Sequence, residues 1–212
     1  MSQEILSKLN TAHIDEISSS RNEPDWLKDY RKNSLSVYDR LPMEMSPLYN
    51  KYTDAKKMDP EKVSLSTSTA DTIPSFLTKR LGELENEICI IQIGTNIHKI
   101  NLPDELKSKG LVISSISDAI ENNSELVKKA LEASKSEEDR FTALNNAAFN
   151  SGIFIHIPRN LIVDKPIHFL TCLSEDGHST ISRNIIFADE SSKATIVQEL
   201  YSPSIQTQQA YL

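Results

Sequence analysis

The chain has 212 residues, of which 38% are hydrophobic, 23 are Lys or Arg and 30 are Asp or Glu, giving a formal net charge of −7. Such a length can bury an ordinary core in one domain or two small ones. An acidic chain without a basic stripe is not expected to bind nucleic acid. No apolar run approaches the roughly 18 residues of a membrane span, and the first residues lack the apolar segment of a signal peptide. We therefore expect a cytoplasmic protein that contacts no membrane.

Two helices are predicted in the segment that ends at Pro42. Apolar residues at helical intervals predict a short helix over about residues 4–19. Asn22 can cap the next helix, Pro24 is tolerated in its first turn and Pro42 stops it. The side of this helix that carries Trp26 and Tyr30 is interpreted as a face that docks on other elements.

A region with mixed patterns follows. Residues 43–70 show little periodicity, which predicts a long loop. A small α/β module is expected after it, because β-branched runs predict three strands over residues 88–93, 97–102 and 111–113. Ser117 and Ser124 are candidate caps of two short connecting helices.

The hydrophobic period changes abruptly at Gly152. Residues from about 137 to 150 have helical spacing, and Gly152 is expected to end that helix. From Ile153 the pattern alternates with period two, as in a strand. The later part of the chain consists of short strand-like runs. We therefore predict two domains, residues 1–150 and residues 151–212.

The strand-like runs alone do not define one architecture. No fixed repeat length is visible, so a sandwich, a barrel and a solenoid all remain open. The residues expected to face inward are Ile155, Ile157, Val163, Ile167, Phe169, Ile185, Phe187 and Ile196.

Motifs for catalysis and metal binding are weak in this sequence. There is no phosphate-binding loop, Cys-x-x-Cys or His-Glu-x-x-His, and no catalytic residue is proposed. The weak metal candidates are His156, His168, Cys172 and His178. His168 and Cys172 share a strand face, but four residues along a strand span roughly 13 Å, so the two cannot hold one ion directly. Cys89 and Cys172 are expected to be reduced, buried thiols, because they lie far apart in the sequence inside strand-like apolar runs. An iron–sulfur cluster usually takes about four thiolates, so two distant cysteines are not expected to hold one.

Three segments carry a resemblance to a known family. They read EPDWLKDYRKNSLSVYDRLPM from Glu23, DRFTALNNAAFNSGIFIHIPRNLIVDKPIHF from Asp139, and RNIIFADESSKATIVQELYS from Arg183. Together they resemble the SufB/SufD family of iron–sulfur cluster assembly scaffolds, and their order is more similar to SufD. The chain resembles the N-terminal part of such a protein.

The resemblance implies a fold class and a function. The fold would be α+β, with an N-terminal helical and small α/β region followed by the first turns of a right-handed parallel β-helix. The function would be that of a non-catalytic scaffold subunit of a SufBCD-type machinery, with a SufB-type scaffold and a SufC-type ATPase as partners of the full-length protein. It implies no cofactor in this chain, since the Fe–S cluster would be held only transiently by the assembled complex. The strand at the end of the chain could also pair with a second copy to form a homodimer.

Two other interpretations stay open. One is a small metal-dependent β-helical or cupin-like enzyme with a site at His156, His168 and His178. The other is a structural interaction domain without a connection to iron–sulfur chemistry. Bound metal in the purified protein would favour the first of these.

Overall fold

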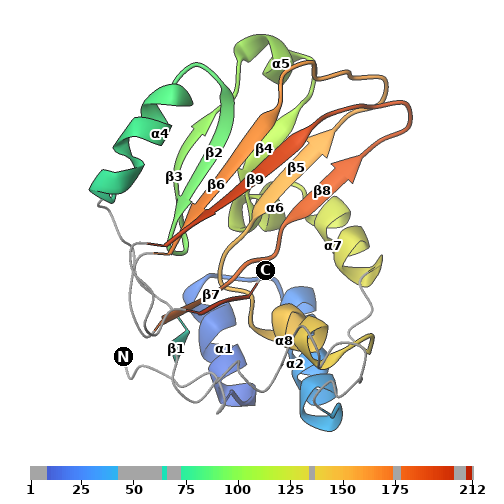
Figure 1. The fold of residues 1–212 in the computed structure, drawn as a ribbon. Coiled ribbons are helices and arrows are strands. Elements are labelled where there is room, and N and C mark those ends of the chain that lie inside the picture. Colours follow the sequence, from blue (N-terminus) through green and yellow to red (C-terminus); the bar gives the residue numbers. More distant parts are fainter. Residues whose placement is uncertain are drawn as a thin grey trace.

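The computed structural model describes residues 9–42, 64–65, 73–133, 137–173, 178–202 and 209–211. It shows a mixed α+β fold in which two sheets stand above a layer of helices (Figure 1). The helices are α1 (Thr11–Ser20), α2 (Asp25–Arg40), the short 3-10 helix η3 (Ser75–Leu77), α4 (Thr78–Glu83), α5 (Asp104–Ser108), α6 (Ile116–Asn122), α7 (Ser124–Ala133) and α8 (Arg140–Ala148). The strands are β1 (Ser64–Leu65), β2 (Ile88–Ile93), β3 (Asn96–Asn101), β4 (Val112–Ser115), β5 (Ile153–Ile157), β6 (Ile167–Cys172), β7 (His178–Ile181), β8 (Ile185–Ala188), β9 (Ile196–Tyr201) and β10 (Gln209–Tyr211).

The helical layer is held together by the apolar side of α2. Leu27 and Leu35 of α2 are buried, and Trp26 and Tyr30 pack partly buried against the same core. This confirms the interpretation of that side as a docking face. The cap prediction was wrong, because Asn22 lies in the preceding turn with φ 51° and Pro24 occupies the N-cap position.

The strands form three sheets. Their orders are β3-β2-β6-β9, β4-β5-β8 and β1-β7-β10. The predicted strand pair at 88–102 is confirmed as the antiparallel pair β2 and β3. The third predicted strand, β4, pairs instead with β5 of the neighbouring sheet. Both larger sheets therefore combine strands from before and after residue 150. The loop predicted over residues 43–70 lies outside the described residues except for β1.

Strands β5, β6 and β7 pair in parallel with the next three strands of the chain, β8, β9 and β10, respectively. Phe154 lies beside Ile185, Ile167 beside Ile196 and Ser179 beside Gln209, so the sequence spacing between paired positions is nearly constant. The turn after β5 recurs at the same spacing after β8, since Asn160 has φ 64° and Ser191 has φ 60°. Solenoid repeats typically have periods of roughly 20–50 residues, and this spacing falls in that range. The structure thus contains a backbone repeat that the residue types did not reveal.

The change from helix to strand is confirmed, but Gly152 does not cause it. Helix α8 is capped by the Asp139 carboxylate, ends at Ala148 and is followed by β5 after a short connection. Gly152 has φ 139°, and a Cβ at this residue would lie 2.0 Å from the Arg183 carbonyl oxygen. A glycine is required here because the two backbone segments approach so closely.

A second core fills the space between the two larger sheets. It contains most residues predicted to face inward: Ile155, Ile157, Val163, Ile167, Phe169 and, partly buried, Ile196. Ile185 does not belong to this core, because it lies beside Phe154 and packs on the helical layer. Phe187 is two residues further along β8 on the same face as Ile185, whereas Ile186 lies beside Ile155 on the other face and is 50% exposed.

Candidate functional site

His156 is the fourth of the five residues of β5 and is partly buried. Its Nε2 atom is 2.9 Å from Oδ2 of Asp189, directly after β8. Its ring and the Phe187 ring are in a T-shaped arrangement, with 5.8 Å between the ring centroids. This weak metal candidate is therefore engaged in a contact that ties β5 to β8.

His168 and Cys172 share a face of β6 with different surroundings. The Nδ1 atom of His168 is 3.5 Å from Oε1 of Glu199 on β9. Cys172 is fully buried and its Sγ donates to the carbonyl of Leu173. Burial raises the pKa of the Cys172 thiol to about 11, so it is protonated at neutral pH. Cys89 is also free and buried, which confirms the prediction of two buried thiols.

The candidate metal ligands are distributed over separate sheets. His156 belongs to the β4-β5-β8 sheet, whereas His168 and Cys172 belong to the β3-β2-β6-β9 sheet. The side chain of His178 lies outside the described residues. Within the described ranges, no group of three or more His, Cys, Asp or Glu residues is placed to hold a metal ion.

The most distinctive feature of the sheets is their last strands, β8 and β9, which we call the β8–β9 edge. In the described part of the chain, each of these strands is paired on one side only. Ile186 is 50% exposed although Ile155 beside it is fully buried, and Leu200 is 56% exposed although Thr171 beside it is 3% exposed. Unpaired backbone groups next to exposed apolar side chains form a template for a further strand.

A polar cluster fixes β9 to the preceding elements. Arg80 of α4 donates to both carboxylate oxygens of Glu199, at 2.9 Å and 2.6 Å, and the Tyr201 hydroxyl donates to the same group. These hydrogen bonds, chiefly those from Arg80, hold the pKa of Glu199 below its usual value. Helix α4 therefore anchors the strand that forms half of the β8–β9 edge.

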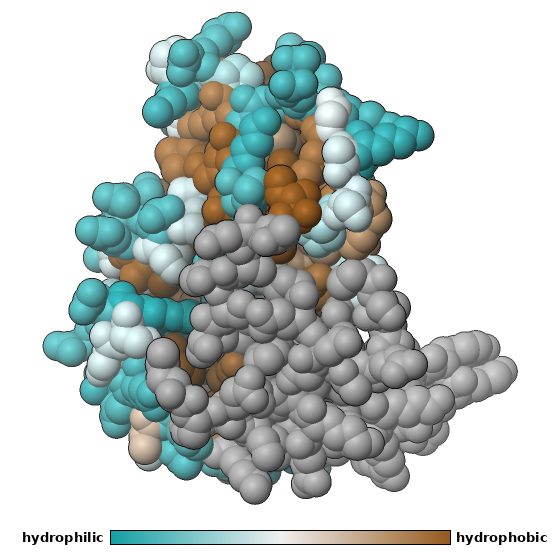
Figure 2. Space-filling model, turned by 90° about the vertical axis from the view of Figure 1, so that its left-hand side faces the viewer, coloured by the Kyte–Doolittle hydropathy of each residue, from teal (hydrophilic) through white to brown (hydrophobic). Residues whose placement is uncertain are grey.

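Apolar surface also occurs elsewhere on the molecule. Figure 2 looks at the side that carries α4 and β3, and apolar surface alternates there with hydrophilic side chains. Phe76 and Ile100, which belong to η3 and β3, are among the exposed large hydrophobic residues. Strand β3 is also an edge strand, but it pairs in antiparallel with β2, whereas β8 and β9 pair in parallel with the strands before them and carry the more exposed Ile186 and Leu200.

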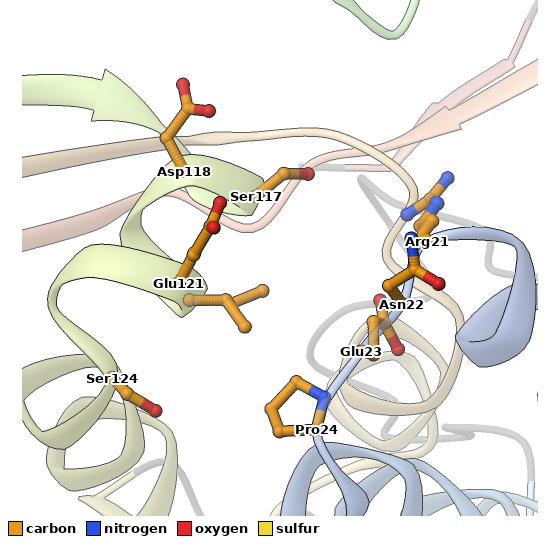
Figure 3. Close-up of a pocket in the computed structure, with 9 residues that line it drawn as sticks. Arg21, Asn22, Glu23, Pro24, Ser117, Asp118, Glu121 and Ser124 are labelled. Carbon is orange, nitrogen blue, oxygen red and sulfur yellow. The ribbon is translucent and has the colours of Figure 1, made fainter.

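A cleft of about 500 Å³ lies between the α1–α2 connection and the corner formed by α6 and α7. Figure 3 shows Arg21, Asn22 and Pro24 on one side and Ser117, Glu121 and Ser124 on the other. The guanidinium of Arg21 donates to the carbonyl oxygens of Phe149 and Asn150. The lining of the cleft is mostly charged and polar, with a small apolar part, as in a site for a polar ligand.

The sequence did not predict the polar residues of the Arg80–Glu199 cluster or of the cleft. Arg80 and Glu199 are 119 residues apart, and no local pattern connects them. The Ser117 cap prediction was wrong, because Ser115 caps α6 and Ser117 lines the cleft. One signal was present: Arg31 stands between Leu27 and Leu35 at helical spacing, on the side of α2 that is buried.

Helices packed beneath small sheets of parallel and antiparallel strands make this a mixed α+β protein. Residues 20–169 match the family model described as the SufBD protein N-terminal region. The chain belongs to the SufBD family, which confirms the resemblance seen in the sequence. The distinction between SufB and SufD stays a prediction.

Named relatives give the same result. An iron–sulfur cluster assembly SufBD family protein of Staphylococcus aureus (strain USA300) is 26% identical over 205 residues, which are 90% of this chain and 43% of the relative. A protein with the same description from Staphylococcus saprophyticus is 25% identical over 210 residues, covering 92% of this chain and 44% of the relative. The chain thus spans less than half the length of these relatives. In the part of the chain that the structure describes, no helix has the length and apolar character needed to cross a membrane.

Proposed function

We propose that this chain is part of a non-catalytic scaffold subunit for iron–sulfur cluster assembly, working in the cytoplasm with a SufB-type scaffold and a SufC-type ATPase. The observation that carries the proposal is membership in the SufBD family, whose model matches residues 20–169. The cluster is the cargo of the assembled complex in this proposal and not a resident cofactor of the chain.

The proposal includes a fold for the strand-rich part: the first turns of a right-handed parallel β-helix. Its support is the parallel register of β5, β6 and β7 with β8, β9 and β10, at a nearly constant sequence spacing. In a solenoid each turn buries its inner face against the next one. The exposed side chains of Ile186 and Leu200 then mark the layer on which another turn or a partner strand would stack.

Purification from the native host tests the function. The protein is tagged at its N-terminus, isolated under reducing conditions, and its partners are identified by mass spectrometry. We expect a SufB-type and a SufC-type protein to co-purify. A double variant, Ile186→Lys with Leu200→Lys, should lose them, whereas Ile162→Lys, at a residue that is 57% exposed in the turn after β5, should retain them. Recovery of the wild-type protein without either partner would contradict the proposal.

The metal-enzyme alternative has a separate test. Near-stoichiometric metal in the purified protein that disappears in His156→Ala and His168→Ala variants would favour it. The structure gives this alternative little support, because His156 and His168 lie in different sheets and contact Asp189 and Glu199, respectively. We therefore expect no difference in metal content between these variants and the wild type.

A further inference from the structure

The end of helix α8 is surrounded by arginine side chains. Arg31 donates to the carbonyl of Ala147 and stacks on the Phe149 ring, with 3.8 Å between its guanidinium carbon and the ring centroid. Arg21 donates to the carbonyl oxygens of Phe149 and Asn150, at 3.4 Å and 3.2 Å. Cations are favoured here because the carbonyl end of a helix carries partial negative charge.

Glu23 lies near both arginines but is hydrogen-bonded to only one of them. Arg31 donates hydrogen bonds to both carboxylate oxygens of Glu23, at 2.8 Å and 2.7 Å, and the Ser18 hydroxyl donates to the same carboxylate. Arg21 forms no ion pair within the described ranges. Burial and the nearby charge of Arg31 lower the pKa of Arg21 to about 10, so Arg21 is still a cation at neutral pH. Glu23 also lines this wall, and its single carboxylate is shared between the charges of Arg21 and Arg31, so the two arginines outnumber it by one positive charge.

The opposite wall of the same cleft is acidic. Glu121 of α6 is exposed, and in the part of the chain that the structure describes its carboxylate forms no ion pair. Asp118 also lies on this wall, where one of its carboxylate oxygens accepts a hydrogen bond from Ser115. Figure 3 shows Ser124 on this side as well, facing the α1–α2 connection across the cleft.

Apolar surface lies between the two charged walls. Ile120 and Pro24 line the cleft together with the polar residues. The cleft volume of about 500 Å³ is within the range of small-molecule sites, roughly 300–1,000 Å³. A ligand that matches this lining has an anionic group for the guanidinium, a cationic group for the carboxylate and a short apolar stem.

We infer that this cleft binds a small zwitterion of the α-amino acid class, with its carboxylate at Arg21, its ammonium group at Glu121 and its side chain against Ile120 and Pro24. A nucleotide or free phosphate fits less well, because Asp118 and Glu121 would repel it. The inference is independent of the proposed scaffold role, since it concerns the helical part of the chain and needs no partner protein.

Titration followed by NMR tests this inference on the chain itself, with L-leucine as the probe. We expect saturable shifts of the backbone amides of residues 21–24 and 117–124, with a dissociation constant in the range of roughly 0.1–1 mM. Isovalerate, which lacks the amine, and 3-methylbutylamine, which lacks the carboxylate, should bind at least about tenfold more weakly, because each loses one charged contact.

Matched variants locate the site. Glu121→Gln and Arg21→Gln should each weaken L-leucine binding by about tenfold or more, whereas Glu125→Gln on α7 and Arg40→Gln on α2 should leave it unchanged. Glu121 is exposed on α6, so its variant decides the outcome even where Arg21→Gln disturbs folding. The inference is overturned by an absence of saturable shifts up to roughly 10 mM, well above the expected constant. It is equally overturned when an end-blocked peptide with an internal Glu and Lys binds more tightly than L-leucine, since the site would then recognise polypeptide.

Discussion

Arg80 and Glu199 join the helix that precedes the first long strand to the strand at the end of the same sheet. The two side chains are 29% and 17% exposed, and two hydrogen bonds connect them. Because charged hydrogen bonds in a partly solvated position are moderately strong, we expect Glu199→Gln to lower the free energy of unfolding by about 1–2 kcal/mol. Urea unfolding at neutral pH measures this. Loss of β9 protection in hydrogen exchange should accompany it, and an unchanged β9 would show that the strand does not depend on Arg80.

The same carboxylate makes stability depend on pH. Hydrogen bonds from Arg80 hold the pKa of Glu199 below its ordinary value of 4.5, so the folded state binds its proton less tightly than the unfolded chain does. Its contribution is therefore present above about pH 4.5 and is lost as the pH falls through the lower pKa of the folded state. We expect the difference in unfolding free energy between wild type and Glu199→Gln to shrink between pH 7 and about pH 3. A difference that stays constant with pH would contradict this assignment.

Local elements could be predicted from the sequence because local patterns determine them. The β-branched run at residues 88–93 and the change of period near Gly152 predicted β2 and the connection from α8 to β5. The backbone repeat that pairs β5 with β8 and β6 with β9 left no such pattern. Ile155 pairs with another isoleucine, Ile186, but Thr171 pairs with Leu200. The backbone pairing therefore repeats, whereas the type of side chain does not.

The cleft and the polar cluster could not be predicted for a related reason. Arg21 and Glu121 face the same cleft only because the α1–α2 connection and α6 pack on the same helical layer. In its own segment each is an ordinary polar residue, Arg21 at the end of α1 and Glu121 within α6. Long-range placement of such residues depends on how the elements pack, and no spacing within one segment records it.

Gly152 provides a sharp test of the close approach between the backbone before β5 and the backbone before β8. A Cβ at residue 152 would lie 2.0 Å from the Arg183 carbonyl oxygen, and its φ of 139° disfavours other residues. We expect Gly152→Ala to destabilise the protein by more than about 3 kcal/mol. Gly82→Ala is the matched control, because no atom lies within 4 Å of its added Cβ. That residue is inside α4, so the control should be neutral or stabilising by up to about 1 kcal/mol. Equal effects of both changes would refute the close approach.

Removing only one partner of the buried ion pair between Arg31 and Glu23 should strongly destabilise the protein. Arg31 is fully buried, and its guanidinium is held by Glu23, the Ala147 carbonyl and the Phe149 ring. Glu23→Ala leaves a buried charge without its partner, so we expect a loss of about 3–5 kcal/mol in thermal or urea unfolding. The double variant Glu23→Leu with Arg31→Met should lose less than Glu23→Ala. Arg40→Ala, which breaks an exposed pair with Glu137, should have no measurable effect.

The β8–β9 edge should make the isolated chain associate. Unpaired strands with exposed Ile186 and Leu200 favour strand addition between two copies, so we expect light scattering to show dimers whose fraction rises with concentration. Ile186→Lys with Leu200→Lys should shift the chain to monomer, and Ile162→Lys should not. A wild-type monomer at all concentrations whose β9 amides are as protected as those of β5 would mean that the edge is already closed.

Thiol chemistry gives the last test, because the sequence has only two cysteines. Cys89 and Cys172 are fully buried, and burial raises the pKa of Cys172 to about 11 and that of Cys89 above its usual value. We expect neither thiol to be alkylated by iodoacetamide at about pH 8 in the folded protein, whereas both react in denaturant. The raised pKa also means that the unfolded chain loses the Cys172 proton first, so stability should fall as the pH rises from about 9 towards 11. Cys172→Ala should remove at most about 2 kcal/mol of that fall. Rapid alkylation of Cys172 without unfolding would show that the strand covering it opens in the folded state.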